Sequence, residues 1–178
     1  MVHFKSLLLL LPVATGLNIQ KRFQFGQLIL DAVTIDNNIK TLTYAVGNWT
    51  EAQTIFGAIP ILTDSNTLGG SINTGASNAQ QSPPLTDDQA ANIAALVEDY
   101  ITPDTATLLA AMKAKKQDFT DVGALGTVQS QINTLRADQT SYSNALLAII
   151  PASGQQQGLN DAAVVDGYFA DAVAYFAS

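Results

Sequence analysis

Apolar side chains recur at steps of three and four residues along most of the chain, and this helical period constrains the fold more than any other feature. A first run comprises Leu28, Ala32, Ile35, Ile39, Leu42, Val46 and Trp49. A second run, with one amide among its members, comprises Leu125, Val128, Ile132, Leu135, Gln139, Tyr142, Leu146 and Ile149. No useful stretch alternates apolar and polar residues as a β-strand would. The sequence therefore predicts an all-α protein.

The segment between these runs is less regular. Residues 55–79 roughly keep the helical spacing, but Gly57, Pro60 and the pair Gly69 and Gly70 interrupt it. A kinked or broken helix is expected there.

Capping signals place the remaining helices. Thr86 and Gln89 match a capping box, which predicts that a helix begins there. Thr102 and Pro103 match the first turn of another helix, so the chain is expected to restart at that point. A last helix follows the loop "PASGQQQG" and begins near Leu159.

The flanking positions of the long seam lack the opposed Glu and Lys residues that set partner choice in coiled-coil dimers. The apolar faces are therefore expected to pack within one chain. We predict an antiparallel bundle of five to six helices, and a monomer.

The N-terminus has the layout of a secretory signal peptide. Lys5 precedes the apolar run "SLLLLLPVA", and small residues follow up to residue 16. This run is far shorter than the ~20 residues needed to cross a bilayer, and no other segment qualifies. We predict a signal peptide over residues 1–16, a secreted protein and no transmembrane segment.

A pair of basic residues follows the predicted signal peptide. Lys21 and Arg22 could be cut by a processing protease of the secretory pathway, which would make residues 17–22 a pro-segment. The alternative is an ordinary basic pair in a frayed N-terminus. In either case residues 23–178 are expected to form a single helical-bundle domain.

Charge and composition exclude several functions. Loss of residues 1–22 leaves five basic and fifteen acidic residues, a net charge of −10, so the chain has no means of holding a phosphate backbone and no nucleic-acid partner is expected. Cysteine is absent, and the one histidine, His3, lies in the predicted signal peptide. The usual metal ligands and general bases are thus missing, and no metal site or cofactor is predicted.

No catalytic constellation is evident either. The acidic pairs Asp87–Asp88 and Glu98–Asp99 are adjacent in sequence, so on a helix their side chains point about 100° apart. They are better explained as complements of a helix dipole and as solvated surface. We predict that the protein is not an enzyme.

Two surface features each have both a functional and a non-functional interpretation. Asn48 begins the sequon "NWT", which predicts an N-glycosylation site in a secreted chain, although such triplets also arise by chance. Lys113, Lys115 and Lys116 form a basic cluster that suits a helix C-terminus, or that could contact an anionic headgroup.

Gln139 lies among the apolar residues of the long seam. It could be a buried amide that sets the register of neighbouring helices. Alternatively, Gln139 and Tyr142 could form the polar end of an internal apolar pocket.

Three stretches of sequence together resemble a known family. They are "TLTYAVGNW", "LTDDQAANIAALVEDYITPDTATLLAAMKAKKQDF" and "VQSQINTLRADQTSYSNALLAIIP", in which Lys115, Lys116 and Phe119 are the most distinctive residues. The pattern is similar to the fungal hydrophobic surface-binding protein A family, also called cell-wall galactomannoproteins, over roughly residues 27–176. The resemblance implies a secreted or cell-wall-associated, non-enzymatic α-helical protein that binds hydrophobic surfaces or lipids, and that in some relatives encloses fatty acids between helices. The chain end "AYFAS" lacks the tail of an anchored relative, so a GPI anchor is not expected.

A lipid could be held in an apolar groove between helices without any strong motif, because each buried methylene contributes ~0.8 kcal/mol. The same side chains could instead be simple core. The candidate pocket residues are Leu42, Val46, Val97, Met112, Ile132, Leu135, Gln139, Tyr142 and Leu146.

Three hypotheses on function follow. The first is a protein that binds fatty acids, other lipids or hydrophobic solid surfaces. The second is a structural or antigenic cell-wall mannoprotein whose function depends on its attached sugar. The third is a helper that recruits a secreted esterase to a hydrophobic polymer.

Overall fold

The computed structural model describes residues 11–50, 52 and 54–178, and the surroundings of their side chains from residue 24 onward. All regular secondary structure in this described part is helical, which confirms the all-α prediction. The helices are α1 (Leu11–Asn48), α2 (Thr54–Gly57), α3 (Ile59–Gln81), α4 (Asp87–Leu96), the π-helix η2 (Val97–Ile101), α5 (Thr102–Ala114), α6 (Lys116–Asp121), α7 (Leu125–Ile149) and α8 (Gln155–Ala177).

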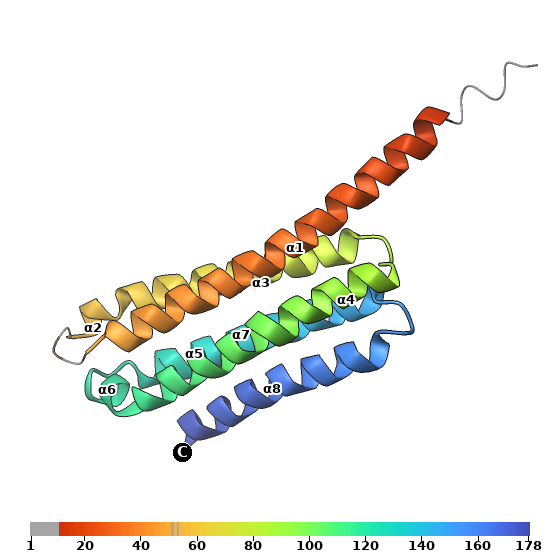
Figure 1. Cartoon of the computed structure of the whole chain (residues 1–178). Coiled ribbons are helices and arrows are strands. Elements are labelled where there is room, and N and C mark those ends of the chain that lie inside the picture. Colours follow the sequence, from red (N-terminus) through yellow and green to blue (C-terminus); the bar gives the residue numbers. More distant parts are fainter. Residues whose placement is uncertain (1–10, 51, 53) are drawn as a thin grey trace, which may run out of the picture.

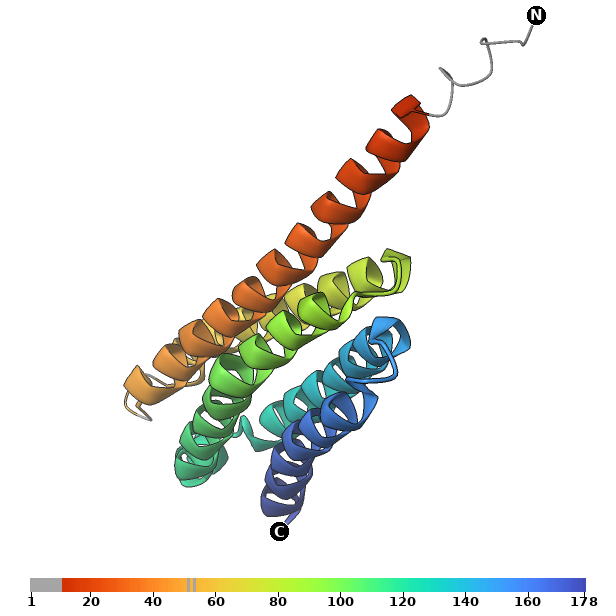
Figure 2. The same ribbon diagram turned by 45° about the vertical axis from the view of Figure 1, so that its right-hand side comes forward.

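Five long segments run alternately in opposite directions along the bundle, namely α1, α3, the continuous path α4–η2–α5, α7 and α8 (Figures 1 and 2). In space α3 packs between α1 and α7, and α8 packs between α7 and α5, while α5 returns to α1. These contacts close a ring of helices around one core. The prediction of an antiparallel bundle of five to six helices is confirmed.

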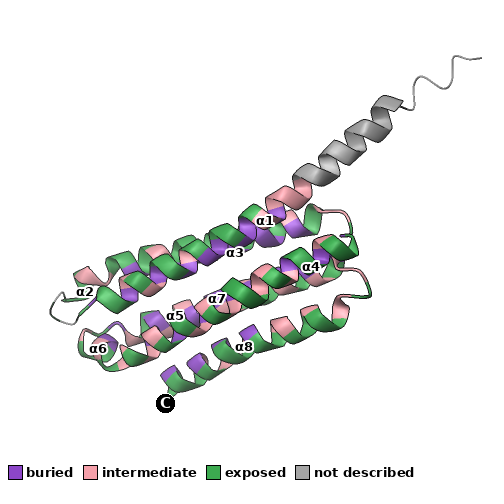
Figure 3. Cartoon of the chain, in the orientation of Figure 1, coloured by how far each residue is buried: buried purple, intermediate pink, exposed green. Residues whose placement is uncertain are grey.

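Both predicted seams face this core. On α7 every seam member after Leu125 is buried, including the amide of Gln139, and Leu125 is half-buried against the core. On α1 the series from Leu28 to Val46 is buried, as is Trp49 directly after the helix. Figure 3 shows the buried residues gathered on the inward faces of the helices.

The expected break in the second segment is only partly correct. A break does separate α2 from α3 next to Gly57, and Pro60 lies in the first turn of α3. The expected break at Gly69 and Gly70 is wrong, because α3 continues through both residues. A Cβ atom at Gly69 would lie 3.0 Å from the Asp138 Oδ2 atom, so this glycine permits a close approach to α7 that offsets its low helix propensity.

The expected restart at Thr102 is partly correct, because α5 begins at Thr102 with Pro103 in its first turn, but no side-chain cap forms there and the chain is not interrupted. The capping box at Thr86 and Gln89 forms as predicted and begins α4. The chain then passes without interruption from α4 to α5 through η2, where the Thr102 backbone N–H donates to the Val97 carbonyl in the wider π-helical pattern. Pro103 lacks a backbone N–H, and the π-helical turn accommodates it without ending the helix.

The first helix extends beyond the bundle at its N-terminal end (Figure 1). Residues 1–10 of the predicted signal peptide lie outside the described residues, as do the side chains of Lys21 and Arg22. The signal peptide, the pro-segment and the domain boundary at residue 23 therefore stay predictions. None of the described helices is long and apolar enough to cross a bilayer.

Candidate functional site

A cavity of about 460 Å³, here called the inner cavity, lies between α4, η2, α7 and α8. Small side chains of α4 leave room for it where larger ones would fill the space. These are Ala90, Ala91, Ala94 and Ala95. The larger apolar side chains of its wall are Ile93, Val97, Ile101, Leu146, Leu147, Ile150 and Val165.

The N-terminal turns of α8 pack tightly against the end of α7. A Cβ atom at Gly158 would lie 2.9 Å from Leu147 Cδ2 and 3.2 Å from Ile150 Cδ1. The Gln155 amide donates hydrogen bonds of 2.7 Å to the carbonyl oxygens of Leu147 and Ile150, which satisfies acceptors at the C-terminus of α7. Helix α8 is therefore held against α7 at this end of the inner cavity.

Three carboxylates line the inner cavity, here called the acidic rim. Gln157 donates to Glu98 and, over 3.1 Å, to Asp161, while the Ser153 hydroxyl donates to Asp87. The pKa of Asp161 is raised above the usual range, because partial burial disfavours its charged form and Glu98 repels it. Asp161 therefore ionises less readily than a free carboxyl group, whereas Asp87 and Glu98 are exposed where the inner cavity meets the surface.

A second hollow of about 610 Å³, here called the outer groove, follows the seam between α7 and α8. The Arg136 guanidinium donates from Nε to Asp166 Oδ1 (2.7 Å) and from Nη2 to Asp166 Oδ2 (2.9 Å), which joins the two helices. This bidentate pair lowers the pKa of Asp166 and raises that of Arg136, because each group hydrogen-bonds the charged form of the other. The other lining residues of the outer groove are Asn133, Ala137, Gln139, Thr140, Ser143, Asn144, Ala162 and Phe169.

Gln139 and Tyr142 are both buried and both line the inner cavity. The Gln139 amide donates to the Ser143 hydroxyl over 3.3 Å. The Tyr142 ring packs against Gly75 of α3, and its buried hydroxyl has no hydrogen-bond partner among the described residues. Burial raises the pKa of Tyr142 well above its usual value, and the charge of Asp31 adds to this, so the phenol is neutral.

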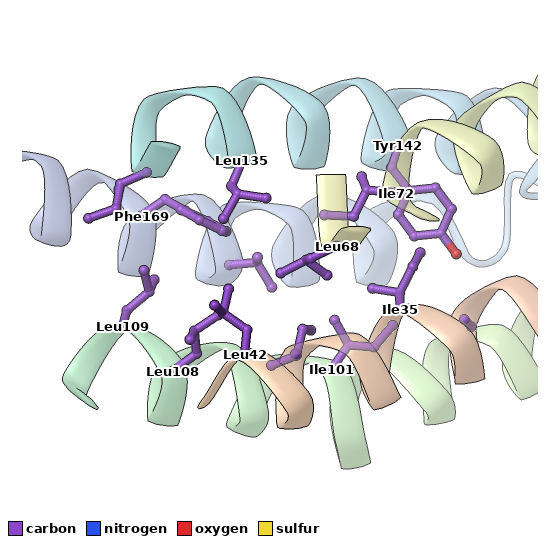
Figure 4. Close-up of a cluster of buried hydrophobic side chains, with 14 of the residues drawn as sticks. Ile35, Leu42, Leu68, Ile72, Ile101, Leu108, Leu109, Leu135, Tyr142 and Phe169 are labelled. Atoms are coloured by element: carbon purple, nitrogen blue, oxygen red, sulfur yellow. The ribbon is translucent and has the colours of Figure 1, made fainter. Parts of the chain in front are cut away.

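The structure separates the nine candidate pocket residues into three groups. Val97, Gln139, Tyr142 and Leu146 come together around the inner cavity. Met112 lines a much smaller hollow of about 50 Å³ beside Phe119. The other four, Leu42, Val46, Ile132 and Leu135, lie in the packed core. Figure 4 shows Leu42 and Leu135 among the buried side chains.

Sequence reasoning did not place the alanines of α4, the glycines of the α7–α8 loop and α8, or Asp161 in a pocket, and it interpreted Asp87 and Glu98 only as a dipole complement and solvated surface. The repeated alanines in "DDQAANIAAL" were the available signal, since small side chains on a core-facing helix either draw helices together or leave a void. The sequence pattern alone does not distinguish these two results.

The predicted surface features lie away from the inner cavity. Asn48 is exposed at the end of α1, where its side-chain amide donates to the Tyr44 carbonyl over 2.9 Å. The lysines of the basic cluster contact groups of the protein itself. Lys113 pairs with Asp171, Lys115 lies 3.3 Å from Asp118, and Lys116 donates to the Tyr175 carbonyl over 2.8 Å.

No group of three or more His, Cys, Asp or Glu side chains that could hold a metal ion occurs among the residues described.

Comparisons with known proteins agree with this architecture. The profile of the family described as hydrophobic surface binding protein A matches residues 26–148. No curated protein sequence matches the chain significantly. The structure of AfMP4p in complex with palmitic acid superposes with a TM-score of 0.82 at 24% identity, over 85% of this chain and 99% of that chain.

Two structures from Penicillium marneffei are also similar. Ligand binding domain 1 of the MP1 protein, complexed with arachidonic acids, has a TM-score of 0.76 at 13% identity, over 82% of this chain and 93% of that one. Ligand binding domain 2 of MP1, complexed with multiple arachidonic acids, has a TM-score of 0.78 at 15% identity, over 87% of this chain and 95% of that one. At these identities the likeness establishes the bundle fold.

Proposed function

The chain belongs to the hydrophobic surface binding protein A family, and from this premise we propose that it binds a long-chain fatty acid or a related lipid in the inner cavity, without catalysing a reaction. The inner cavity is the observation that carries this proposal. Its volume of about 460 Å³ falls in the range of small-molecule sites, roughly 300–1,000 Å³. The complexes of AfMP4p with palmitic acid and of MP1 domains with arachidonic acids support an acyl chain as the ligand.

The lining suits such a ligand. Aliphatic side chains and alanines surround most of the inner cavity, and α7 contributes the polar groups of Gln139, Tyr142 and Ser143. Burial of a dozen methylenes would contribute roughly 10 kcal/mol before the costs of association and chain ordering. Shape and apolar contact would therefore supply most of the affinity.

The experiment is native mass spectrometry of the protein purified from a eukaryotic secretion host, followed by organic extraction of whatever is released. We expect a mass increment equal to a fatty acid, either after purification or after addition of palmitic acid. A protein that stays free of ligand with both palmitic and arachidonic acid would contradict the proposal.

A second function, adsorption to hydrophobic surfaces, is favoured by a separate observation. Ile55, Phe56, Ile59 and Leu62, here called the apolar tip, are exposed by 49%, 77%, 56% and 38% at the start of α3 and just before it. No charged residue occurs from residue 54 to residue 63. Several large apolar side chains exposed together are typical of an interaction site.

Adsorption can be measured on wax or polystyrene particles with the double variant Phe56→Ser, Ile59→Ser. We expect its adsorption to fall severalfold. Tyr44→Ser is the matched control, because Tyr44 is 74% exposed on α1, outside the apolar tip. Equal adsorption of the double variant and the wild type would contradict a role for the tip.

The proposal includes secretion, a cell-wall location, a glycan at Asn48 and a monomeric state. The alternatives are a structural mannoprotein and a helper of a secreted esterase. Asn48→Gln would distinguish the structural mannoprotein from a lipid-binding protein. Lipid binding should persist in this variant, whereas retention in the cell wall would be lost if it depended on the sugar. Co-purification with an esterase on a solid polyester would be required for the second.

A further inference from the structure

The inner cavity and the outer groove lie on either side of the same helix seam. Both are lined by Gln139 and Ser143 of α7 and by Ala162 of α8. These three side chains, here called the window, therefore form the partition between the two hollows. Two of them are small, and Gln139 can change rotamer when its 3.3 Å hydrogen bond to Ser143 breaks.

The window lies between two contacts that join α7 to α8. Toward the loop, Gly158 packs against Leu147, and farther along the helices Arg136 pairs with Asp166. Ala162 lies one helical turn from each of Gly158 and Asp166. Between these contacts α8 contributes Asp161, Ala162 and Val165 to the lining of the inner cavity, and of these only Ala162 also lines the outer groove.

The charges around the two hollows orient an anionic ligand. The inner cavity carries the acidic rim of Asp87, Glu98 and Asp161, and no Lys or Arg is among its described lining residues. Arg136 is the one basic residue among the described residues that line either hollow. A fatty-acid carboxylate would be repelled at the rim and attracted at Arg136, since like charges in a partly dry site disfavour each other.

We propose that the acyl chain enters the inner cavity through the window, and that Arg136 binds the ligand carboxylate in the outer groove by exchanging it for Asp166. The proposal rests on the fatty-acid function proposed above and assigns its headgroup site and its route of entry.

The exchange is chemically balanced, since one carboxylate replaces another on the same guanidinium. Arg136 and Asp166 have side chains 35% and 46% exposed, so their mutual attraction is weakened by solvent and Asp166 can return to water after the exchange. The planar guanidinium would keep its bidentate geometry with the new partner.

The test compares palmitic acid with 1-hexadecanol, which has the same chain length and no charge, by displacement of an uncharged fluorescent dye. Arg136→Met should weaken the binding of palmitic acid about tenfold and leave that of hexadecanol unchanged, because only the charged headgroup loses a partner. Arg136→Lys should keep part of the preference, and Asp166→Asn should tighten the binding of the acid by removing its competitor. Circular dichroism establishes that each variant is folded.

The outcomes separate the two proposals. If the wild type binds neither ligand, the fatty-acid function fails. If it binds both, and Arg136→Met leaves the ratio of the two affinities unchanged, the headgroup site is overturned while the cavity function stands.

The route of entry is tested with Ala162→Leu. A bulkier side chain in the window should slow association and dissociation of both ligands together. Weaker binding at an unchanged association rate would place Ala162 only in the cavity wall and overturn the route.

Discussion

Helix α7 has two sides that use small residues in opposite ways. Toward α3, Gly69 and Gly75 lack side chains at the points where Leu135, Asp138 and Tyr142 of α7 approach them. The helices lie so close there that an added Cβ would be 3.0 Å from Asp138 or Tyr142. Toward α4, small residues leave the inner cavity instead.

Whether a small residue gives a close contact or a cavity depends on whether the two helix backbones can approach each other. Helix α3 approaches α7 along much of its length, whereas α8 is held in place by its tight contact at Gly158 and by the buried rings of Phe169 and Phe176. A small residue thus shortens an interhelix distance only where nothing else fixes that distance. The densely packed side of α7 and its cavity side should therefore respond differently to substitution.

The largest expected effect is the loss of a side chain on the dense side. Leu135→Ala should lower the free energy of unfolding by about 3 kcal/mol, because Leu135 is buried and its removal leaves a new void. Leu146→Ala on the cavity side should cost clearly less, because Leu146 already borders empty space. Urea unfolding measures both. Equal losses would show that the two sides are packed alike.

The second prediction concerns the close approach of α3 to α7. Gly75→Ala should destabilise by about 2 kcal/mol, because the new Cβ would meet the Tyr142 ring at 3.0 Å and Ile35 at 3.4 Å. Gly70→Ala is the matched control on the same helix, with nothing within 4 Å of its Cβ, and should stabilise by about 0.5–1 kcal/mol. Thermal melts of both variants check the contrast, and stabilisation by Gly75→Ala would refute it.

A third prediction fills the inner cavity. Ala94→Phe should weaken the binding of palmitic acid at least about tenfold, equivalent to ~1.4 kcal/mol, while stability is kept or raised. Ala110→Phe, on the exposed face of α5, should leave the binding unchanged. Dye displacement measures both variants. Undiminished binding by Ala94→Phe would place the ligand elsewhere.

The smallest effect concerns the Arg136–Asp166 pair. The pKa of Asp166 is lowered in the folded state, so the pair stabilises the fold above the usual carboxyl pKa, and this stabilisation is lost as pH falls through the lowered value. Because both side chains are partly exposed, the effect should be small. The urea midpoints of the wild type and Asp166→Asn should differ slightly near pH ~7 and converge as the pH falls below the usual carboxyl range. A difference that is constant with pH would argue against this pair as its source.

Much of the architecture could be read from residue spacing. The seams from Leu28 to Trp49 and from Val128 to Ile149 are buried as predicted, and the capping box at Thr86 forms. The errors arose where tertiary contacts override local preference, as at Gly69, whose packing against α7 keeps α3 continuous.

The candidate pocket was less accessible to this reasoning. Leu135 and Leu146 occupy equivalent positions of one helical period, yet one is packed against α3 and the other lines the inner cavity. A period gives the direction in which a side chain points from its own helix, but not the distance to the helix opposite.

The sequence by itself determined the helical class, the inward-facing seams, the acidic charge and the absence of cysteine and of any histidine beyond His3. These follow from local spacing and composition, which need no knowledge of neighbours. Only the tertiary structure decided that the alanines of α4 line the inner cavity, that Arg136 meets Asp166 across the α7–α8 seam, and that Gln139, Ser143 and Ala162 line both hollows. Those features depend on distances between helices far apart in the chain, and such distances are set by the packing of all the side chains together.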